Sequence, residues 1–281
     1  MTSTPQGPRG ERVPDELRES MTSGLALAAA GANVIMQLSM APIGHGVAES
    51  VVHSGSLVRH PFKRTRTTLG YIMIALFGTE HERDVLGREV NRQHRLVRSG
   101  PESPVAYNAF DPELQHWVAA CMYRGACDAL SALHGEVAPA TLDALYANCA
   151  RFATTLQVPP AMWPRDRDAF ETYWNEQLRE VAMDEITRAY LRSIARLDFL
   201  ARPLRAMFGP LHEVLTVGFL PEPFRAELGL AWNPRREAVF RSFMALARRA
   251  HRLAPRPLRE FPLNLALWDA RRRIRRGRAL V

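Results

Sequence analysis

One histidine stands at the edge of an apolar helix face and could act as a ligand or a proton carrier. In "VNRQHRLVRSG", residues 90–100, helical spacing sets His94 beside Leu86, Val90 and Val97. A neutral imidazole that turns inward needs a partner for each of its two ring nitrogens. The sequence therefore raises the question of what satisfies His94.

A second polar group lies upstream, in the segment 61–77. Arg64 and Thr68 are four residues apart, so a helix would present both on one inward line. An inward guanidinium is costly unless a carboxylate or another anion meets it. Tyr107 and His116 are further candidates for the same polar set.

Two interpretations of these residues remain open at this point. In the first, other protein groups supply their partners: His94 is hydrogen-bonded to a backbone carbonyl, and Arg64 is paired with Glu49 or Glu89. In the second a heme lies between helices. An imidazole then supplies the axial nitrogen, apolar residues sandwich the macrocycle, and a cationic arginine meets propionates or reacting oxygen.

Other chemistry-bearing patterns are weak. The sequence has no P-loop, no G-x-S-x-G, no H-E-x-x-H and no C-x-x-C. Cys121, Cys127 and Cys149 are odd in number and are expected to be buried thiols. His45 and His53 are alternative ligands, although surface or supporting roles fit them better.

The elements that must position these residues are all predicted to be helices. Pro and Gly punctuate helical periods, and no run of alternating β-branched residues predicts a strand. Thr79 and Glu82 predict a T-x-x-E capping box, and Asp111 with Pro112 predicts a helix start. We expect an all-α, globin-reminiscent bundle with a buried cofactor pocket, built from helices over 23–39, 61–77, 79–99, 111–135, 139–156, 166–182, 184–201, 203–216, 221–228 and 234–253.

The domain organisation is expected to be simple. A flexible N-terminal arm over 1–20 precedes one helical catalytic domain over 21–262, and 263–281 forms a helix end and an arginine-rich, solvated tail.

Composition narrows the partners and the location. The formal charge of +8 comes almost wholly from arginine, since Lys63 is the only lysine, so we expect no nucleic-acid partner. Residues 21–48 contain no Asp, Glu, Lys or Arg, yet Gly, Asn, Gln and Pro dilute them, which favours a core helix over a stable membrane span. Acidic residues precede this segment where a signal peptide needs basic ones, so a cytoplasmic location is expected.

Several stretches together resemble a known family. They are "MQLSMAPIGHGVAESVVHSG", "RTRTT", "VNRQHRLVRSG", "AYNAFDPELQHWVAAC", "LQVPP" and "FLPEPFRAELGLAWNPRR". This order resembles the MpaB and latex-clearing-protein (rubber oxygenase) catalytic-domain family, over roughly residues 20 to 260. The resemblance implies an all-helical fold that holds a non-covalent b-type heme, with His94 as the proximal iron ligand.

The resemblance also implies the remaining site residues and the activity. Arg64 and Thr68 match the family's R-x-x-x-T of the heme pocket, and Tyr107 is taken as a further cofactor-binding residue. The implied activity is that of an oxygenase that uses dioxygen on a small hydrophobic substrate, either isoprenoid or alkene-like or aromatic. Family members often have Ala-His-Pro where this chain has Met40-Ala41-Pro42.

Other functions stay open. The same heme could serve peroxygenase or oxidative coupling chemistry. A non-catalytic protein that binds a lipid-like ligand, or a regulator that uses the arginine-rich tail, is the alternative from another class.

Overall fold

The computed structural model describes residues 15–49 and 60–280. Within these residues every regular element is a helix, and the only ladder-type contact is an isolated bridge between Arg98 and Asn108. The predicted all-α class is therefore confirmed. The predicted N-terminal arm lies mostly outside the described residues, as does His53.

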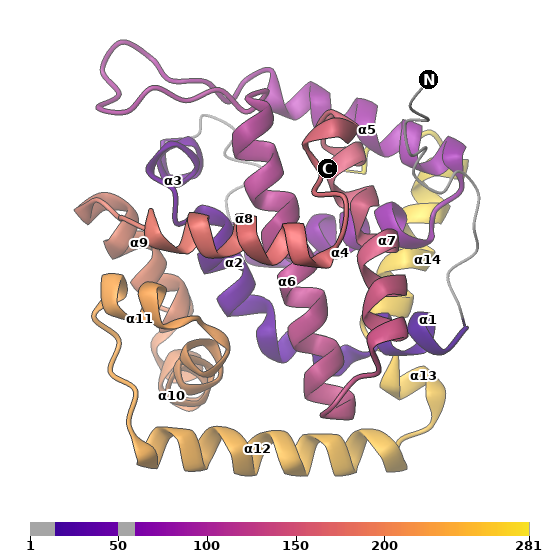
Figure 1. The fold of residues 1–281 in the computed structure, drawn as a ribbon, viewed down its shortest axis with the longest axis vertical. Helices are drawn as coiled ribbons and strands as arrows, with labels where there is room; N and C mark the ends of the chain where they lie inside the picture. The colour runs from indigo at the N-terminus through magenta and orange to yellow at the C-terminus, as the bar shows by residue number, and fades with distance from the viewer. Residues whose placement is uncertain (1–14, 50–59, 281) are drawn as a thin grey trace.

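The helices follow one another with short connections (Figure 1). Their bounds are α1 Asp15–Met21, η1 Gly24–Ala29, α2 Ala30–Leu38, α3 Ala41–Ala48, α4 Pro61–Phe77, α5 Glu80–His94, α6 Pro112–His134, α7 Pro139–Thr155, η3 Pro160–Met162, α8 Arg167–Arg179, α9 Glu185–Ala195, α10 Arg202–Phe219, α11 Glu222–Leu228, α12 Pro234–Leu253, α13 Arg256–Arg259 and α14 Leu263–Arg275.

Helix α6 forms the centre of the molecule, with η1, α2 and α7 packed around it (Figure 1). It begins where the Asp111 carboxylate accepts hydrogen bonds from Glu113 N (2.8 Å) and Leu114 N (3.4 Å). It ends at Gly135, whose φ of 76° suits glycine. Trp117 is fully buried, and its indole N–H donates to the Met36 carbonyl of α2 over 2.9 Å.

Helices α4 and α5 form a tight pair. Pro61 occupies the first turn of α4, and α4 ends before Gly78. The Thr79 hydroxyl then accepts from Glu82 N (3.2 Å), while the Glu82 carboxylate accepts from Thr79 N (2.8 Å). This is the predicted capping box, and it fixes how α5 leaves α4.

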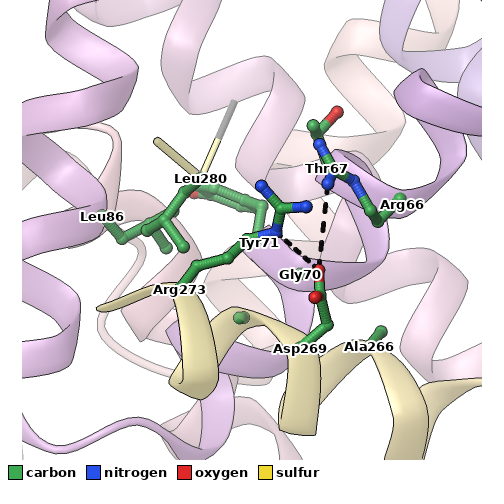
Figure 2. Close-up of a pocket in the computed structure, with 10 residues that line it drawn as sticks. Arg66, Thr67, Gly70, Tyr71, Leu86, Ala266, Asp269, Arg273 and Leu280 are labelled. Carbon is green, nitrogen blue, oxygen red and sulfur yellow. Dashed lines mark hydrogen bonds and ion pairs between the residues drawn. The ribbon is translucent and has the colours of Figure 1, made fainter. Parts of the chain in front are cut away.

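Helix α14 packs along α4 on the side shown in Figure 2. The Cβ of Ala270 lies 3.8 Å from the position a Cβ on Gly70 would take, so the two helices approach closely. The Asp269 carboxylate meets Arg273 (2.7 Å) and, more loosely, Arg66 of α4 (3.9 Å). A cavity of about 10 Å³ remains between the helices, the size of roughly one water molecule.

The arginine-rich C-terminus differs from the predicted solvated tail. The Arg271 guanidinium donates to the Phe77 carbonyl (3.0 Å) and to the Glu82 carboxylate (3.1 Å). The chain then folds back, and Leu280 is only 7% exposed. Arg271 thus has carbonyl and carboxylate partners on α4 and α5, a tertiary pairing that a run of like charges does not reveal, whereas Arg275, Arg276 and Arg278 are exposed.

The uncharged segment 21–48 contributes to the core, as predicted. Ala32, Ile35 and Met36 of α2 are fully buried. The expected continuous helix over 23–39 is instead divided into η1 and α2.

Among the described residues, part of the same segment comes nearest to the length and composition of a membrane span. No single helix among the described residues is long and apolar enough to cross a membrane. One pair, Gly24–Leu38 with Ala41–Ala48, meets the criteria together but bends by 106°.

Replacing Arg271 tests how α14 supports the α4–α5 pair. We expect Arg271→Ala to lower the free energy of unfolding by about 1.5 kcal/mol, because two hydrogen bonds are lost, one of them to a carboxylate that is partly screened by solvent. Urea denaturation measures this loss. Arg276→Ala, at an exposed position on the same segment, is the control and should stay within about 0.5 kcal/mol of wild type; equal losses in both variants would contradict the role of Arg271.

Candidate active site

Arg64 and Thr68 lie one turn apart near the start of α4, as the spacing predicts. Thr68 is half-buried, whereas Arg64 is exposed rather than buried. Desolvation nevertheless lowers the pKa of the Arg64 guanidinium. Neighbouring protein atoms therefore partly desolvate a guanidinium that water still reaches.

His94 is the last residue of α5 and is half-buried. Its Nδ1 atom is buried and has no hydrogen-bond partner among the described residues. The ring of Phe110 contacts the imidazole edge-on, with 6.2 Å between ring centroids. The imidazole is thus held by packing, and its Nδ1 atom has no partner within residues 15–49 and 60–280.

The residues after His94 form a hairpin that carries Phe110 back to it. Val97 N donates to the His94 carbonyl (2.9 Å), Ser99 N to the Tyr107 carbonyl (2.8 Å) and Ala109 N to the Val97 carbonyl (2.9 Å). In Figure 1 this hairpin follows α5 and passes above α3. Gly100, Pro101 and Pro104 lie between the two arms and permit the turn, whereas α5 already ends at His94 instead of running to residue 99 as predicted.

Electrostatics link α4 to α5 and to α9. Burial, together with the positive charge of Arg64, lowers the pKa of His94 to about 4. The imidazole is therefore neutral at pH 7, which is the form that can donate a lone pair to a metal. Burial raises the pKa of Tyr190 on α9, and Arg64 opposes that rise, so Tyr190 also lies within the field of Arg64.

The pairings that the first interpretation names are absent among the described residues. The Glu49 carboxylate accepts from His45 (2.5 Å) and from the Tyr107 hydroxyl (3.2 Å). Glu89 pairs with an arginine of its own helix at 3.0 Å. In the described part of the chain, Arg64 has no ion pair within 4 Å, and the expected carbonyl bond to His94 Nδ1 is absent.

His45 is fully buried and bridges two carboxylates, so a surface role is excluded. Its Nδ1 and Nε2 lie 2.5 Å from Glu49 Oε1 and Asp184 Oδ2. Asp184 also caps α9 by accepting from Thr187 N (2.7 Å). The bridge ties α3 to α9, and Tyr107 joins it through Glu49.

Tyr107 and His116 are not brought together with Arg64. The Tyr107 ring packs against Gly46 of α3, and no contact among the described residues joins it to His94. His116 is buried on α6 and stacks on Tyr173, with centroids 4.5 Å apart and planes at 26°. Burial lowers the pKa of His116, so its imidazole is neutral, and its Nε2 is likewise buried with no hydrogen-bond partner among the described residues.

The available donors suit a heme better than a bare metal ion. No group of three His, Cys, Asp or Glu side chains in the described residues could hold a metal ion. His94 offers one neutral imidazole with an orphaned buried nitrogen, and Arg64 offers a cation with no carboxylate partner. A heme needs one imidazole and favours a cation near its propionates, because the macrocycle supplies the other ligands.

Sequence reasoning missed two groups. Tyr190 and Asp184 lie more than 120 residues beyond Arg64 and His45, the residues they face, so no local spacing marks them. For His45 a signal exists: Glu49 follows it at i+4 in a segment with no other charge.

Comparisons with known proteins place these residues in a family. Residues 17–249 match the family described as "ER-bound oxygenase mpaB/B'/Rubber oxygenase, catalytic domain". A Mycobacterium bovis protein and a Mycobacterium tuberculosis protein, both described as uncharacterized, are each 47% identical over 250 residues, which is 89% of this chain and 98% of each relative. No solved structure matches the chain significantly.

The buried bridge predicts a pH-dependent contribution to stability. The hydrogen bond to Glu49 raises the pKa of His45, and the bond from His45 lowers the pKa of Glu49. Burial raises the pKa of Asp184, but its hydrogen bonds from Thr187 and His45 outweigh that and leave it lowered. Because the imidazole pKa is raised on folding, its contribution to stability is fully present below about pH 6.5 and disappears as the pH rises through the folded-state pKa. Because the carboxylate pKa values are lowered on folding, their contribution is present above about pH 4 and disappears on acidification.

We therefore expect His45→Gln to lower the free energy of unfolding by roughly 2 kcal/mol near pH 5.5 and by clearly less near pH 9. The effect is kept to this size because the two carboxylate partners are about one-third exposed, so solvent screens them. Urea denaturation at both pH values measures the difference. His81→Gln, an exposed histidine on α5, is the matched control and should show no such trend. A loss for His45→Gln that is the same at both pH values would contradict an ionised bridge.

Proposed function

Because the chain belongs to the catalytic-domain family of the ER-bound oxygenase mpaB/B' and rubber oxygenase, we propose that it is a b-type heme-dependent oxygenase. Its substrate would be a small hydrophobic molecule with an alkene, isoprenoid or aromatic group. The family supports an oxidoreductase of the oxygenase class, and the heme, its ligand and the substrate class are the parts that this proposal adds. Residues 21–262 would form the catalytic domain, in the cytoplasm.

One observation carries the proposal. A neutral imidazole with an orphaned buried nitrogen lies within the field of an arginine that has no carboxylate partner among the described residues. A buried polar atom without a partner costs about 1 to 3 kcal/mol, so such a pair calls for a ligand. The nitrogen of His94 needs a partner and the guanidinium of Arg64 needs an anion. A heme would meet both needs, because its iron binds an imidazole nitrogen and its propionates carry negative charge.

The residues would divide the work by their chemistry. His94 would hold the iron through a ring nitrogen, while Phe110 keeps the imidazole plane in place. Bound heme supplies the activation of dioxygen that protein side chains cannot provide. Arg64 would neutralise a propionate or polarise an oxygen atom, and the Thr68 hydroxyl on the same helix line would orient a polar group beside it.

Tyr107 would act on this site through the hairpin. Its hydroxyl donates to Glu49, and its backbone carbonyl accepts from Ser99 in the arm that follows His94. It would thus fix the segment that follows His94, an indirect part in heme binding in place of the direct contact that the sequence predicted. The family description names rubber oxygenase, and rubber is a hydrocarbon polymer. The description therefore supports a hydrophobic substrate.

The first test is an absorption spectrum of the purified chain produced with a heme precursor. Wild type should show a Soret band and a b-type pyridine hemochrome. His94→Ala should lose most of the band, because the only protein ligand proposed for the iron is removed. His81→Ala, at the start of the same helix and exposed, should keep full occupancy.

Circular dichroism shows whether both variants remain folded. A colourless wild type after reconstitution with hemin would overturn the heme, and would favour the non-catalytic ligand-binding alternative. Full occupancy in His94→Ala would overturn the ligand assignment alone.

Arg64→Ala tests the cation. We expect turnover to fall on the order of 100-fold, the cost of removing one charged group that stabilises developing charge. Oxygen uptake with a panel of small alkenes, isoprenoids and aromatic compounds measures it. Arg95→Ala, one residue beyond His94 and exposed, should keep turnover within about twofold; unchanged turnover in Arg64→Ala would remove Arg64 from the site.

A further inference from the structure

A second, larger cavity of about 240 Å³ lies where α1, α4, α13 and α14 meet, on the yellow end of the chain in Figure 1. It is separate from Arg64 and His94. The residues that line it include four arginines, one acid and one tryptophan: Arg18, Arg256, Arg271, Arg275, Glu260 and Trp268.

Positive charge exceeds negative charge in this cavity. Arg271 is occupied by Glu82 and by a carbonyl, and Arg256 by Glu260 at 2.6 Å. Arg18 lies over the Phe77 ring, with 4.7 Å from its Cζ to the centroid. In the described chain neither Arg18 nor Arg275 has a carboxylate within ion-pairing distance, so two guanidinium groups remain available to an anion.

Helices α13 and α14, which help to line the cavity, and the turn between them also carry large exposed apolar side chains, which we call the apolar rim. Trp268 lines the cavity and is itself 52% exposed, and Leu265, one turn away on α14, is 50% exposed. Leu258 of α13 and Phe261 in the following turn are 66% and 56% exposed. Four large apolar side chains in eleven residues of sequence, beside a basic cavity, are more than scattered surface residues.

From this juxtaposition we infer that the α13–α14 face docks on an anionic phospholipid membrane surface. The cavity takes the phosphate of a lipid headgroup between Arg18 and Arg275, and the four apolar side chains enter the boundary between headgroups and acyl chains. Tryptophan, phenylalanine and leucine beside arginine are the composition of surfaces that lie in this boundary without crossing it. A soluble phosphate would account for the arginines but not for the exposed apolar rim.

This face belongs to this chain's C-terminal segment. Residues 256–275 lie beyond the match to the oxygenase family, which ends at residue 249. The inference therefore stands whether or not the proposed activity is correct.

Vesicle sedimentation with the full chain tests the charged part. The chain should pellet with phosphatidylcholine vesicles that contain roughly 30% phosphatidylglycerol and not with phosphatidylcholine alone, and salt should weaken binding. Arg18→Gln with Arg275→Gln should weaken binding by about 25-fold, near fivefold for each arginine. Arg165→Gln with Arg241→Gln removes the same charge from well-exposed sites elsewhere and should change binding by less than about twofold.

A second pair of variants tests the apolar part. Leu258→Ser with Leu265→Ser should lose at least about tenfold in binding, because two side chains no longer leave water on docking. Met207→Ser with Leu246→Ser, both more than half exposed on other helices, should bind like wild type.

Several results would overturn the inference. Equal binding to neutral and anionic vesicles, or equal losses in the test and control variants, would show that the face has no special role. Displacement by inorganic phosphate far beyond the effect of sodium chloride at equal ionic strength, with no vesicle binding, would assign the cavity to a soluble anion. If the double arginine variant fails to fold, Arg275→Gln alone, at an exposed position, keeps the test intact.

Discussion

The Glu82 carboxylate is the point on which the site geometry depends. One oxygen accepts from Thr79 N and so begins α5, while the other meets Arg271 of α14. Arg271 in turn donates to the Phe77 carbonyl at the end of α4. A single acid, with its side chain 15% exposed, therefore joins the end of one helix, the start of the next and the helix that packs behind them. Arg64 on α4 and His94 on α5 take their relative positions from this joint.

The distribution of carboxylates explains why the positive charge of Arg64 is not neutralised by an acid among the described residues. Glu49 and Asp184 are both committed to the buried His45, and Glu89 lies beside an arginine of its own helix. Arg64 is left with a lowered pKa and, among the residues described, no acid beside it, and its charge adds to the burial that keeps the His94 imidazole neutral. Had one of those acids paired with Arg64, the structure would gain an ion pair and lose the positive potential that a cofactor carboxylate or a developing negative charge requires.

The sequence predicted what local chemistry determines. Helix α4 has the predicted bounds of 61–77. The capping box of α5 and the proline starts of α4 and α6 also lie at the predicted positions, because these signals act within four residues. The predicted helix over 23–39 was only partly right, since its alanine-rich first turns adopt a 3-10 geometry against α6. The pairing of His45 with Asp184 spans 139 residues, and the partners of Arg271 are on α4 and α5. Such long-range pairings are fixed by packing, which no periodicity encodes.

Helix α4 connects the two functional regions inferred for this chain. Its Arg64 and Thr68 belong to the proposed heme site, whereas Met73, further along the helix, lines the basic cavity near α14. Between them, α14 packs along α4, with Ala270 close to Gly70, so a shift of α14 would press on α4. A membrane that holds α14 in one position would therefore also hold the helix that carries Arg64. An oxygenase with a hydrophobic substrate would gain from this arrangement, since such a substrate concentrates in the bilayer on which the enzyme rests.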